Sequence, residues 1–139
     1  MLLDETCVKD LVELSKAPDF PCKLDFEKAE IYCGLDKSIR TFGKYDNAHR
    51  LVSVVTVTFI RVFPSKDSPN GKIAHISGAY TLPEYRGRGI MTKMLNMIIH
   101  IAKKYGIDYL CCDSIADDLY YKCGFIKPSH NETRLWKPL

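Results

Sequence analysis

The stretch that decides the fold is Tyr80-Thr81-Leu82-Pro83-Glu84-Tyr85-Arg86-Gly87-Arg88-Gly89-Ile90-Met91. An apolar run of strand character ends before the proline, and two glycines lead into a segment whose apolar residues recur at helical spacing. At a helix start the first backbone N–H groups lack intrahelical partners, and the helix dipole adds partial positive charge. Glycine lets a ligand approach such a backbone closely. The stretch therefore predicts a strand–loop–helix unit with the features of a phosphate cradle.

A phosphate site is one of two interpretations of this loop. Arg86 and Arg88 offer donors suited to phosphate oxygens, but two solvated arginines on an ordinary strand-to-helix turn would give the same sequence. Two common nucleotide motifs are absent, since the chain has neither Gly-x-x-x-x-Gly-Lys-Ser/Thr nor Gly-x-Gly-x-x-Gly here. A lone Gly-x-Gly is weak evidence for a phosphate site, so the choice between the two interpretations depends on the rest of the chain.

Outward from the loop, the pattern alternates between strand and helix. We expect helices at residues 4–16, 25–35, 90–105 and 117–123, and strands at 40–45, 51–63, 72–82, 107–112, 125–127 and 133–136. The 25–35 helix is expected to be capped by Asp25 and to end near Gly34, and Tyr105 is expected to complete the apolar stripe of the 90–105 helix. Gly78, inside a strand, predicts a bulge. The result is a mixed α/β chain.

Length and composition predict one globular domain covering residues 1–139. Residues 1–50 hold 10 acidic and 8 basic side chains, whereas residues 51–139 hold 7 acidic and 12 basic ones. This mild excess is not the basic stripe of a nucleic-acid-binding protein. No apolar run reaches the ~20 residues of a membrane-spanning helix, and the N-terminus lacks a secretory pattern. We therefore expect no nucleic-acid or membrane partner, and a cytoplasmic location.

The cysteines and histidines give no pattern of a metal site. The six cysteines contain no Cys-x-x-Cys pair, and the four histidines do not cluster with them. Zinc sites need closely spaced ligands, and disulfides are uncommon without secretion. We therefore expect no metal, and thiols that are reduced and mostly structural, Cys112 included.

Two motifs resemble those of the GCN5-related N-acetyltransferase (GNAT) family. Residues 86–91 (Arg-Gly-Arg-Gly-Ile-Met) are similar to its acetyl-CoA signature, Arg/Gln-x-x-Gly-x-Gly/Ala, but depart from it at Met91, where the family has a small residue. Residues 116–125 (Ala-Asp-Asp-Leu-Tyr-Tyr-Lys-Cys-Gly-Phe) are similar to the family's Ala-x-x-Leu-Tyr-x-Lys-x-Gly-Phe. The resemblance implies a mixed, largely antiparallel twisted sheet flanked by helices, with splayed central strands. The family's first strand is absent or very short here, because the first expected helix begins almost at Met1.

The resemblance implies acetyl transfer from acetyl-CoA, a co-substrate, to a primary amine by direct attack in a ternary complex. The acceptor would be a small-molecule or peptide amine, and a homodimer is a candidate assembly. A competing interpretation is a non-catalytic module of the same fold that binds acetyl-CoA or CoA. Met91 and the short first strand favour that module, whereas Tyr120 in its motif argues against it.

The resemblance also implies the cofactor contacts. The diphosphate would lie on the backbone amides of residues 86–91, and the pantetheine arm would run beside the backbone of the strand before the loop. Asp113 stands where the family often has Asn and is a further candidate contact, although a carboxylate suits an anionic ligand less well. The expected cofactor-binding residues are Tyr80, Thr81, Leu82, Arg86, Gly87, Arg88, Gly89, Ile90, Met91 and Asp113.

Two residues are candidates for proton transfer. By its place in the motif Tyr120 would protonate the departing CoA thiolate, since a tyrosine with a pKa near ~10 is protonated at neutral pH. The alternative is a packed tyrosine with its hydroxyl in water, and Tyr121 would face elsewhere. His75 is the candidate general base, since an unperturbed pKa of ~6.5 suits proton relay. The alternative is a partly buried strand histidine with a backbone partner.

Two groups of acidic residues have more than one interpretation. Glu84, in the loop beside the arginines, is expected to form a surface ion pair. The acidic residues of the first two helices and their linker, Asp19 among them, either attract a cationic amine or form a solvated face.

Overall fold

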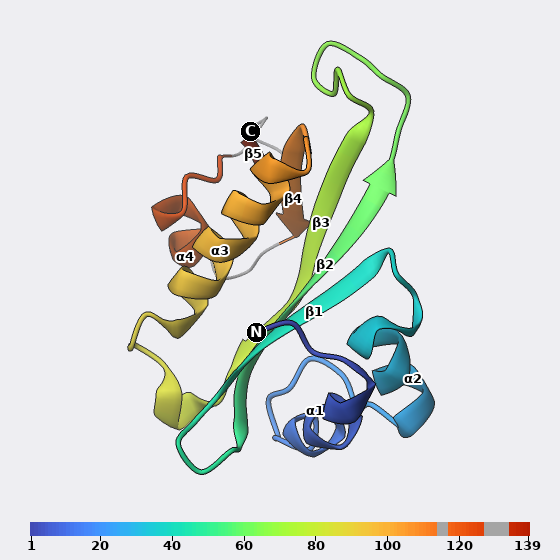
Figure 1. Ribbon diagram of the computed structural model, residues 1–139. Coiled ribbons are helices and arrows are strands. Elements are labelled where there is room, and N and C mark those ends of the chain that lie inside the picture. The colour runs from blue at the N-terminus through green and yellow to red at the C-terminus, as the bar shows by residue number, and fades with distance from the viewer. Residues whose placement is uncertain (114–116, 127–133) are drawn as a thin grey trace. The chain divides into compact units, whose positions relative to one another are not determined.

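The computed structural model describes residues 1–113, 117–126 and 134–139 (Figure 1). Its helices are α1 (Val8–Leu14), α2 (Phe26–Glu30), α3 (Ile90–Lys104) and α4 (Asp117–Lys122), and its strands are β1 (Ile39–Tyr45), β2 (Leu51–Arg61), β3 (Lys72–Thr81), β4 (Tyr109–Asp113) and β5 (Arg134–Pro138). Short helical turns are η1 (Glu5–Cys7), η2 (Ile31–Leu35) and η3 (Pro83–Tyr85). The expected element order is confirmed except near residue 126, where Ile126 forms a single bridge to Trp136. Residues 127 and 133 of the last expected strands lie outside the described residues.

The strands form one five-stranded sheet in the order β1-β2-β3-β4-β5. β3 and β4 are parallel, with Ile73 opposite Tyr109 and Ile76 opposite Cys112, while β4 and β5 are antiparallel. Because a parallel pair needs a long crossover connection, α3 lies in the chain between β3 and β4. The mixed, largely antiparallel sheet predicted from the sequence is confirmed.

The register described between β3 and β4 ends before β3 reaches the glycine-containing loop. Their described pairs end at Ile76 and Cys112, and two residues later Gly78 has a φ of 60°, in the left-handed region that favours glycine. β3 then continues to Thr81. The positive φ fits an irregularity of the strand at Gly78, and the splaying of the central strands stays a prediction.

The chain forms two compact units, and each is described by itself. Unit 1 comprises Met1–Val57 and Gly78–Met91, and unit 2 comprises Thr58–Ser77 and Thr92–Leu139. Three elements, β2, β3 and α3, have residues in both units. The glycine-containing loop therefore belongs to unit 1, whereas α4 and β5 belong to unit 2.

The core of unit 1 forms between α1, α2 and the strands. Figure 1 shows α1 and α2 on the same side of β1. Asp25 caps α2 as predicted, because its carboxylate accepts a hydrogen bond from the Lys28 amide at 2.9 Å, and Gly34 ends η2 with a φ of 105°. The buried core residues are Leu3, Cys7, Val8, Leu11, Leu14, Ala29, Cys33, Leu51, Val52, Val54, Tyr80 and Leu82.

The first strand is reduced to a single bridge on the outer edge of β1. Leu2 pairs with Phe42, and the flanking hydrogen bonds run from the Leu3 amide to the Thr41 carbonyl and from the Gly43 amide to the Met1 carbonyl, both at 2.8 Å. The very short first strand expected from the sequence is therefore present, because Asp4 caps η1 immediately afterwards.

In unit 2 the buried residues of α3 include one outside the predicted stripe and exclude Tyr105, which was expected to complete it. Ile99 is buried, whereas Tyr105 is 63% exposed. The expectation for Tyr105 is wrong because α3 ends at Lys104 and Gly106, with a φ of 71°, turns the chain immediately after it. Other buried residues of this unit are Ala74, Ile76, Met94, Leu95, Ile98, Ala102, Leu110, Cys112, Tyr120, Phe125 and Leu135. Within the described ranges no helix is long and apolar enough to cross a membrane.

Candidate functional site

The glycine loop, residues 83–89 of unit 1, connects β3 to α3. Gly87 and Gly89 have φ values of 76° and 77°, a backbone conformation that glycine adopts far more easily than other residues. A Cβ at either position would meet no atom within 4 Å. The backbone conformation, rather than crowding, therefore requires glycine here, and the space over both residues is open.

The backbone amides of this loop are the donors that a phosphate group needs. The Arg86 amide is already used, because it donates to the Pro83 carbonyl at 3.2 Å. Among the described residues, no backbone acceptor bonds to the amides of residues 87–89, and the first amides of α3 lack intrahelical acceptors because a helix leaves them free. The Arg86 amide thus has a backbone acceptor, whereas none is given for the amides of residues 87–89 within the described part of the chain.

The two arginines of the loop are held by neighbours within unit 1. Arg88 donates from Nη2 to the Glu84 carbonyl oxygen at 3.0 Å, and its guanidinium lies over the Tyr85 ring, 4.9 Å from the centroid. The Glu84 carboxylate instead pairs with Arg50 at 3.2 Å. The expected surface ion pair of Glu84 is therefore present, with a partner from the β1–β2 turn.

Arg86 is held by Asp19, which lies between α1 and α2. Its Nη2 donates to Asp19 Oδ2 at 2.6 Å, and its Nε donates to the Thr81 carbonyl at 2.8 Å. The other oxygen of the carboxylate, Oδ1, accepts a hydrogen bond from the Tyr80 hydroxyl at 2.5 Å. Asp19 therefore binds a predicted cofactor residue, while its side chain stays 47% exposed.

The pKa values of this cluster shift in the directions that the hydrogen bonds require. The Tyr80 hydroxyl, followed by the Arg86 guanidinium, lowers the pKa of Asp19 from its usual value of 3.8. Burial, followed by the bond to Asp19, raises the pKa of Tyr80 to about 12. At neutral pH Asp19 is therefore ionised and Tyr80 is protonated.

The bond between Asp19 and Arg86 is the feature of this region that the sequence did not indicate. Asp19 lies 67 positions before Arg86, and no period or motif links the two. Its position between Pro18 and Pro21 is the only local signal, since prolines restrict the backbone of a loop.

Tyr80, Thr81 and Leu82, the three predicted pantetheine contacts at the end of β3, do not all direct their backbone groups to the same side. The Leu82 amide donates to the Val52 carbonyl at 2.9 Å, and the Tyr80 carbonyl accepts from Ser53 Oγ at 3.1 Å. Both residues therefore direct backbone groups toward β2. Because successive residues of a strand direct their backbone groups to opposite edges, Thr81 is the one of the three whose amide and carbonyl face away from β2.

Unit 2 brings together two other predicted residues. His75 Nε2 lies 3.6 Å from Asp113 Oδ2. The two side chains share a face of the sheet, because His75 is opposite Cys111 in the parallel register and Asp113 follows two residues later. His75 is 31% exposed and Asp113 is 64% exposed. His75 thus has a carboxylate neighbour and is partly buried.

Tyr120 lies on α4 with its side chain buried. It packs edge-to-face against Phe125, with ring centroids 5.3 Å apart, and only 5% of the residue is exposed. Burial raises the pKa of Tyr120 well above that of a free tyrosine, and the Cys112 and Cys123 thiols add to the effect. The hydroxyl is therefore protonated at neutral pH, as a proton donor must be.

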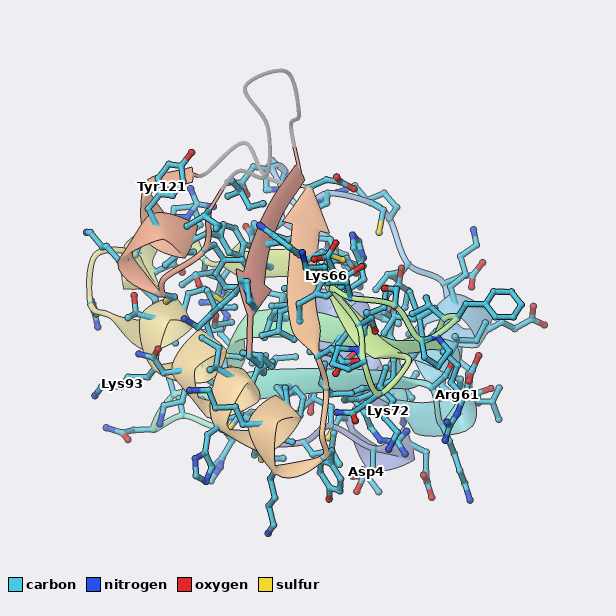
Figure 2. The ribbon with its side chains drawn as sticks, turned by 90° about the horizontal axis from the view of Figure 1, so that it is seen from above. Asp4, Arg61, Lys66, Lys72, Lys93 and Tyr121 are labelled. Carbon is cyan, nitrogen blue, oxygen red and sulfur yellow. The ribbon has the colours of Figure 1, made fainter. Side chains whose placement is uncertain are left out.

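Tyr121 faces elsewhere, as predicted. Figure 2 shows its side chain on the outside of α4, and 43% of the residue is exposed. Ala116, the first residue of the motif that contains both tyrosines, lies outside the described residues. In the parts of the chain that the structure describes, no three His, Cys, Asp or Glu side chains are grouped as metal ligands would be.

The predicted site residues thus fall into two sets. Unit 1 contains the cofactor-binding candidates Tyr80, Thr81, Leu82, Arg86, Gly87, Arg88, Gly89, Ile90 and Met91, and unit 2 contains His75, Asp113 and Tyr120. Within these sets the structure brings together Tyr80 with Arg86 and His75 with Asp113. The Met91 side chain is buried, so it does not stand exposed above the loop.

Comparison with protein families gives one match, to the family described as Acetyltransferase (GNAT) family, over residues 8–125. A search of curated protein sequences finds no match. Many solved structures have a similar fold.

One similar structure is a predicted acetyltransferase from Clostridium acetobutylicum with acetyl-CoA, which has a TM-score of 0.77 and 21% identity over 94% of this chain and 90% of that one. Another is a ribosomal-protein-alanine N-acetyltransferase from Brucella melitensis biovar Abortus 2308, with a TM-score of 0.74 and 16% identity over 95% of each chain. A third is glucosamine-6-phosphate N-acetyltransferase from Arabidopsis thaliana, with a TM-score of 0.76 and 16% identity over 95% of this chain and 93% of that one. At these identities the likeness concerns the fold.

Proposed function

The chain belongs to the acetyltransferase (GNAT) family, and from this premise we propose that it transfers the acetyl group of acetyl-CoA to a primary amine by direct attack in a ternary complex. The observation that carries the proposal is the family match over residues 8–125. The glycine loop supports it, because its amides are available at the start of α3, where a helix favours anions. Acetyl-CoA supplies an activated thioester, and this chain's residues would bind it and move the protons.

In this proposal the diphosphate of acetyl-CoA is bound by the glycine loop. The amides of residues 87–91 would donate to its oxygens, which come close only because Gly87 and Gly89 carry no Cβ over the open side of the loop. Arg86 and Arg88 would add charge-assisted donors. The loop thus has the donor chemistry that a diphosphate requires.

The pantetheine arm would run along the edge of β3. Its amides are peptide-like, so they can bond to backbone groups along a strand edge, where the Thr81 carbonyl already accepts a hydrogen bond from Arg86 Nε. Thr81 is the best-placed of the three predicted residues, since Tyr80 and Leu82 direct backbone groups toward β2. Asp113 remains a weaker candidate, because it already has an ionisable neighbour in His75.

Tyr120 is proposed as the general acid. A departing thiolate leaves more readily when a nearby group donates a proton, and the raised pKa of Tyr120 keeps its hydroxyl protonated.

His75 is proposed as the general base that accepts a proton from the attacking amine. An imidazole accepts through one nitrogen while the other donates, so a carboxylate neighbour can fix its orientation. Asp113, at 3.6 Å from Nε2, would be the group that orients His75.

The acceptor is proposed to be a small-molecule or peptide amine, in a cytoplasmic enzyme. Support comes from relatives whose names specify such acceptors, a ribosomal-protein alanine in one and glucosamine 6-phosphate in another. A homodimer is compatible with this proposal, which requires no nucleic-acid or membrane partner.

The proposal is tested by measuring thiol release from acetyl-CoA with a panel of amines that includes peptides with free N-termini, lysine peptides, polyamines and amino sugars. Amine-dependent release is expected with at least one class. Binding of CoA by calorimetry, without release for any amine, would instead support the non-catalytic module. Failure to bind CoA would contradict both functions.

A further inference from the structure

Asp19 is joined to two residues at the place where the cofactor is proposed to bind. One carboxylate oxygen accepts from the Arg86 guanidinium at 2.6 Å, and the other accepts from the Tyr80 hydroxyl at 2.5 Å. Phe20, the next residue, packs edge-to-face on the Tyr80 ring, with centroids 4.9 Å apart. The segment between α1 and α2 is thus fixed to the end of β3 by several contacts, of which only one involves the arginine.

These contacts use only some of the hydrogen-bond donors of Arg86. A guanidinium has five N–H donors, and the described bonds use one at Nε, to the Thr81 carbonyl, and one at Nη2, to Asp19. The side chains of Arg86 and Asp19 are 50% and 47% exposed, so this ion pair is in contact with water. Exposed pairs of this kind are weak enough to exchange partners.

The charge of Asp19 opposes the binding of an anion beside it. A carboxylate paired with Arg86 offsets the charge that the guanidinium would otherwise offer to a diphosphate, and it repels the diphosphate directly. A buried and permanent pair would simply remove Arg86 from cofactor binding. An exposed pair leaves Arg86 available but lowers the net gain when a diphosphate binds.

We infer that Asp19 is a positioning residue that limits the affinity of the glycine loop for the diphosphate of acetyl-CoA by competing for Arg86. The inference rests on the proposed function, since it assumes that the loop binds this ligand. When the diphosphate binds, Arg86 turns toward it, while Tyr80 and Phe20 keep Asp19 and its segment in place. Asp19 therefore acts on the cofactor through Arg86 and does not itself touch the cofactor.

The test uses Asp19→Asn, which keeps a short polar side chain that can still accept from Arg86 but removes the charge. Isothermal calorimetry with CoA is expected to show binding that is roughly two- to fivefold tighter than in the wild type, a change in the range for exposed charge pairs. Dephospho-CoA, which retains the diphosphate, is expected to show the same gain. Pantetheine, which lacks the diphosphate, is expected to show none, whereas a purely structural change would alter both classes of ligand.

Two further variants connect the effect to Arg86. Arg86→Gln is expected to weaken CoA binding, and adding Asp19→Asn to it is expected to give a smaller gain than in the wild type, because only the direct repulsion remains to be relieved. Glu13→Gln is the matched control, since Glu13 is an exposed carboxylate of unit 1 paired with Lys16 at 2.9 Å, and its CoA affinity is expected to equal that of the wild type. Thermal unfolding shows whether each variant is folded, and Asp19→Ser replaces Asp19→Asn if the latter is not.

The outcomes separate the inference from the function on which it rests. If the wild type binds CoA but Asp19→Asn binds it equally or more weakly, or gains equally for pantetheine or in the Arg86→Gln background, the role of Asp19 is overturned while the cofactor site stands. If the wild type does not bind CoA, the proposed function fails, and the inference fails with it.

Discussion

The glycine loop of unit 1 and the Tyr120 region of unit 2 carry their proposed chemistry in opposite ways. The loop is exposed, its donors are backbone amides, and its arginines form exposed contacts that water weakens. Tyr120 is buried, its contribution is one side-chain hydroxyl, and its pKa is set by burial. As proposed, binding by the loop is distributed over many weak donors, whereas proton donation in unit 2 depends on one group.

This difference has a consequence for mutational sensitivity. A site built from several exposed donors loses a fraction of its affinity when one is changed, because the others remain. A site that depends on one buried hydroxyl loses its function when that hydroxyl is removed, although the fold need not change. Substitutions in the two regions should therefore differ both in magnitude and in the kinetic constant that they affect.

The largest effect is expected for Tyr120→Phe. Removing a positioned proton donor lowers the rate by about 10²- to 10⁴-fold, so kcat should fall by this order while the Kd for CoA stays the same. Phenylalanine preserves the ring that packs on Phe125, and the variant should therefore remain folded. Steady-state kinetics with the best amine of the panel give the measurement.

Tyr121→Phe is the control for this substitution, since it removes the same atom from an exposed neighbour on the same helix. Its kcat should equal that of the wild type. Unchanged turnover in Tyr120→Phe would show that another group, or water, protonates the thiolate, and the contrast between the two regions would then be lost.

A smaller effect is expected for Gly89→Ala. An alanine in the left-handed conformation costs roughly 1–2 kcal/mol, and its Cβ would occupy the open space over the loop. We expect roughly tenfold weaker CoA binding, measured by calorimetry, with little change in kcat at saturating acetyl-CoA.

Gly34→Ala is the matched control for the loop. Gly34 is also a glycine of unit 1 with positive φ and open space around its missing Cβ, so alanine should cause a similar loss of stability. Its CoA affinity should stay at the wild-type value. Equal losses of CoA affinity in both variants would mean that general destabilisation, and not the loop geometry, controls binding.

The same contrast explains what the sequence could predict. The glycine loop, the Asp25 cap and the end of η2 were predictable in kind because each depends on a few consecutive residues, such as a capping carboxylate or a glycine with positive φ. Tyr105 was misplaced for the same reason, since the apolar period continues past Lys104 although the helix ends there. Local patterns predict elements well and their last residue poorly.

The side-chain partners were not predictable in this way. Asp19 binds Arg86, and Glu84 pairs with Arg50, yet each pair is distant in sequence and neither has a spacing rule. The packing of helices and strands decides which side chains of such pairs come together. The sequence alone does not show which of the chain's many basic residues lies next to a given exposed carboxylate. The resemblance to a family supplied roles for Arg86 but could not supply its partner.

A third prediction concerns Met91, the position where the loop departs from the family signature. Its side chain is buried, so Met91→Ala should lower the free energy of unfolding by about 2–3 kcal/mol and leave the Kd for CoA unchanged. Chemical denaturation and calorimetry on the same preparation give the two quantities. If CoA binds markedly more tightly to Met91→Ala, Met91 obstructs the cofactor, and the interpretation as an impaired module gains support.

The smallest effect is expected in the pH dependence of stability at Asp19. Hydrogen bonds from Tyr80 and Arg86 lower the pKa of Asp19 below its usual 3.8, so the folded state binds this proton less readily than the unfolded state does. The resulting stabilisation is present above pH 3.8 and is lost as the pH falls through the lowered pKa of the folded protein. Asp19→Asn cannot titrate, so the difference in melting temperature between wild type and variant should shrink as the pH falls from 5 toward 3, a window chosen from that value of 3.8.

A difference that stays constant over this range would mean that the bonds to Asp19 do not depend on its charge. The exposed pair with Arg86 would then be too weak to compete with a diphosphate, and the contrast between a distributed loop and a single buried hydroxyl would rest on the backbone amides alone.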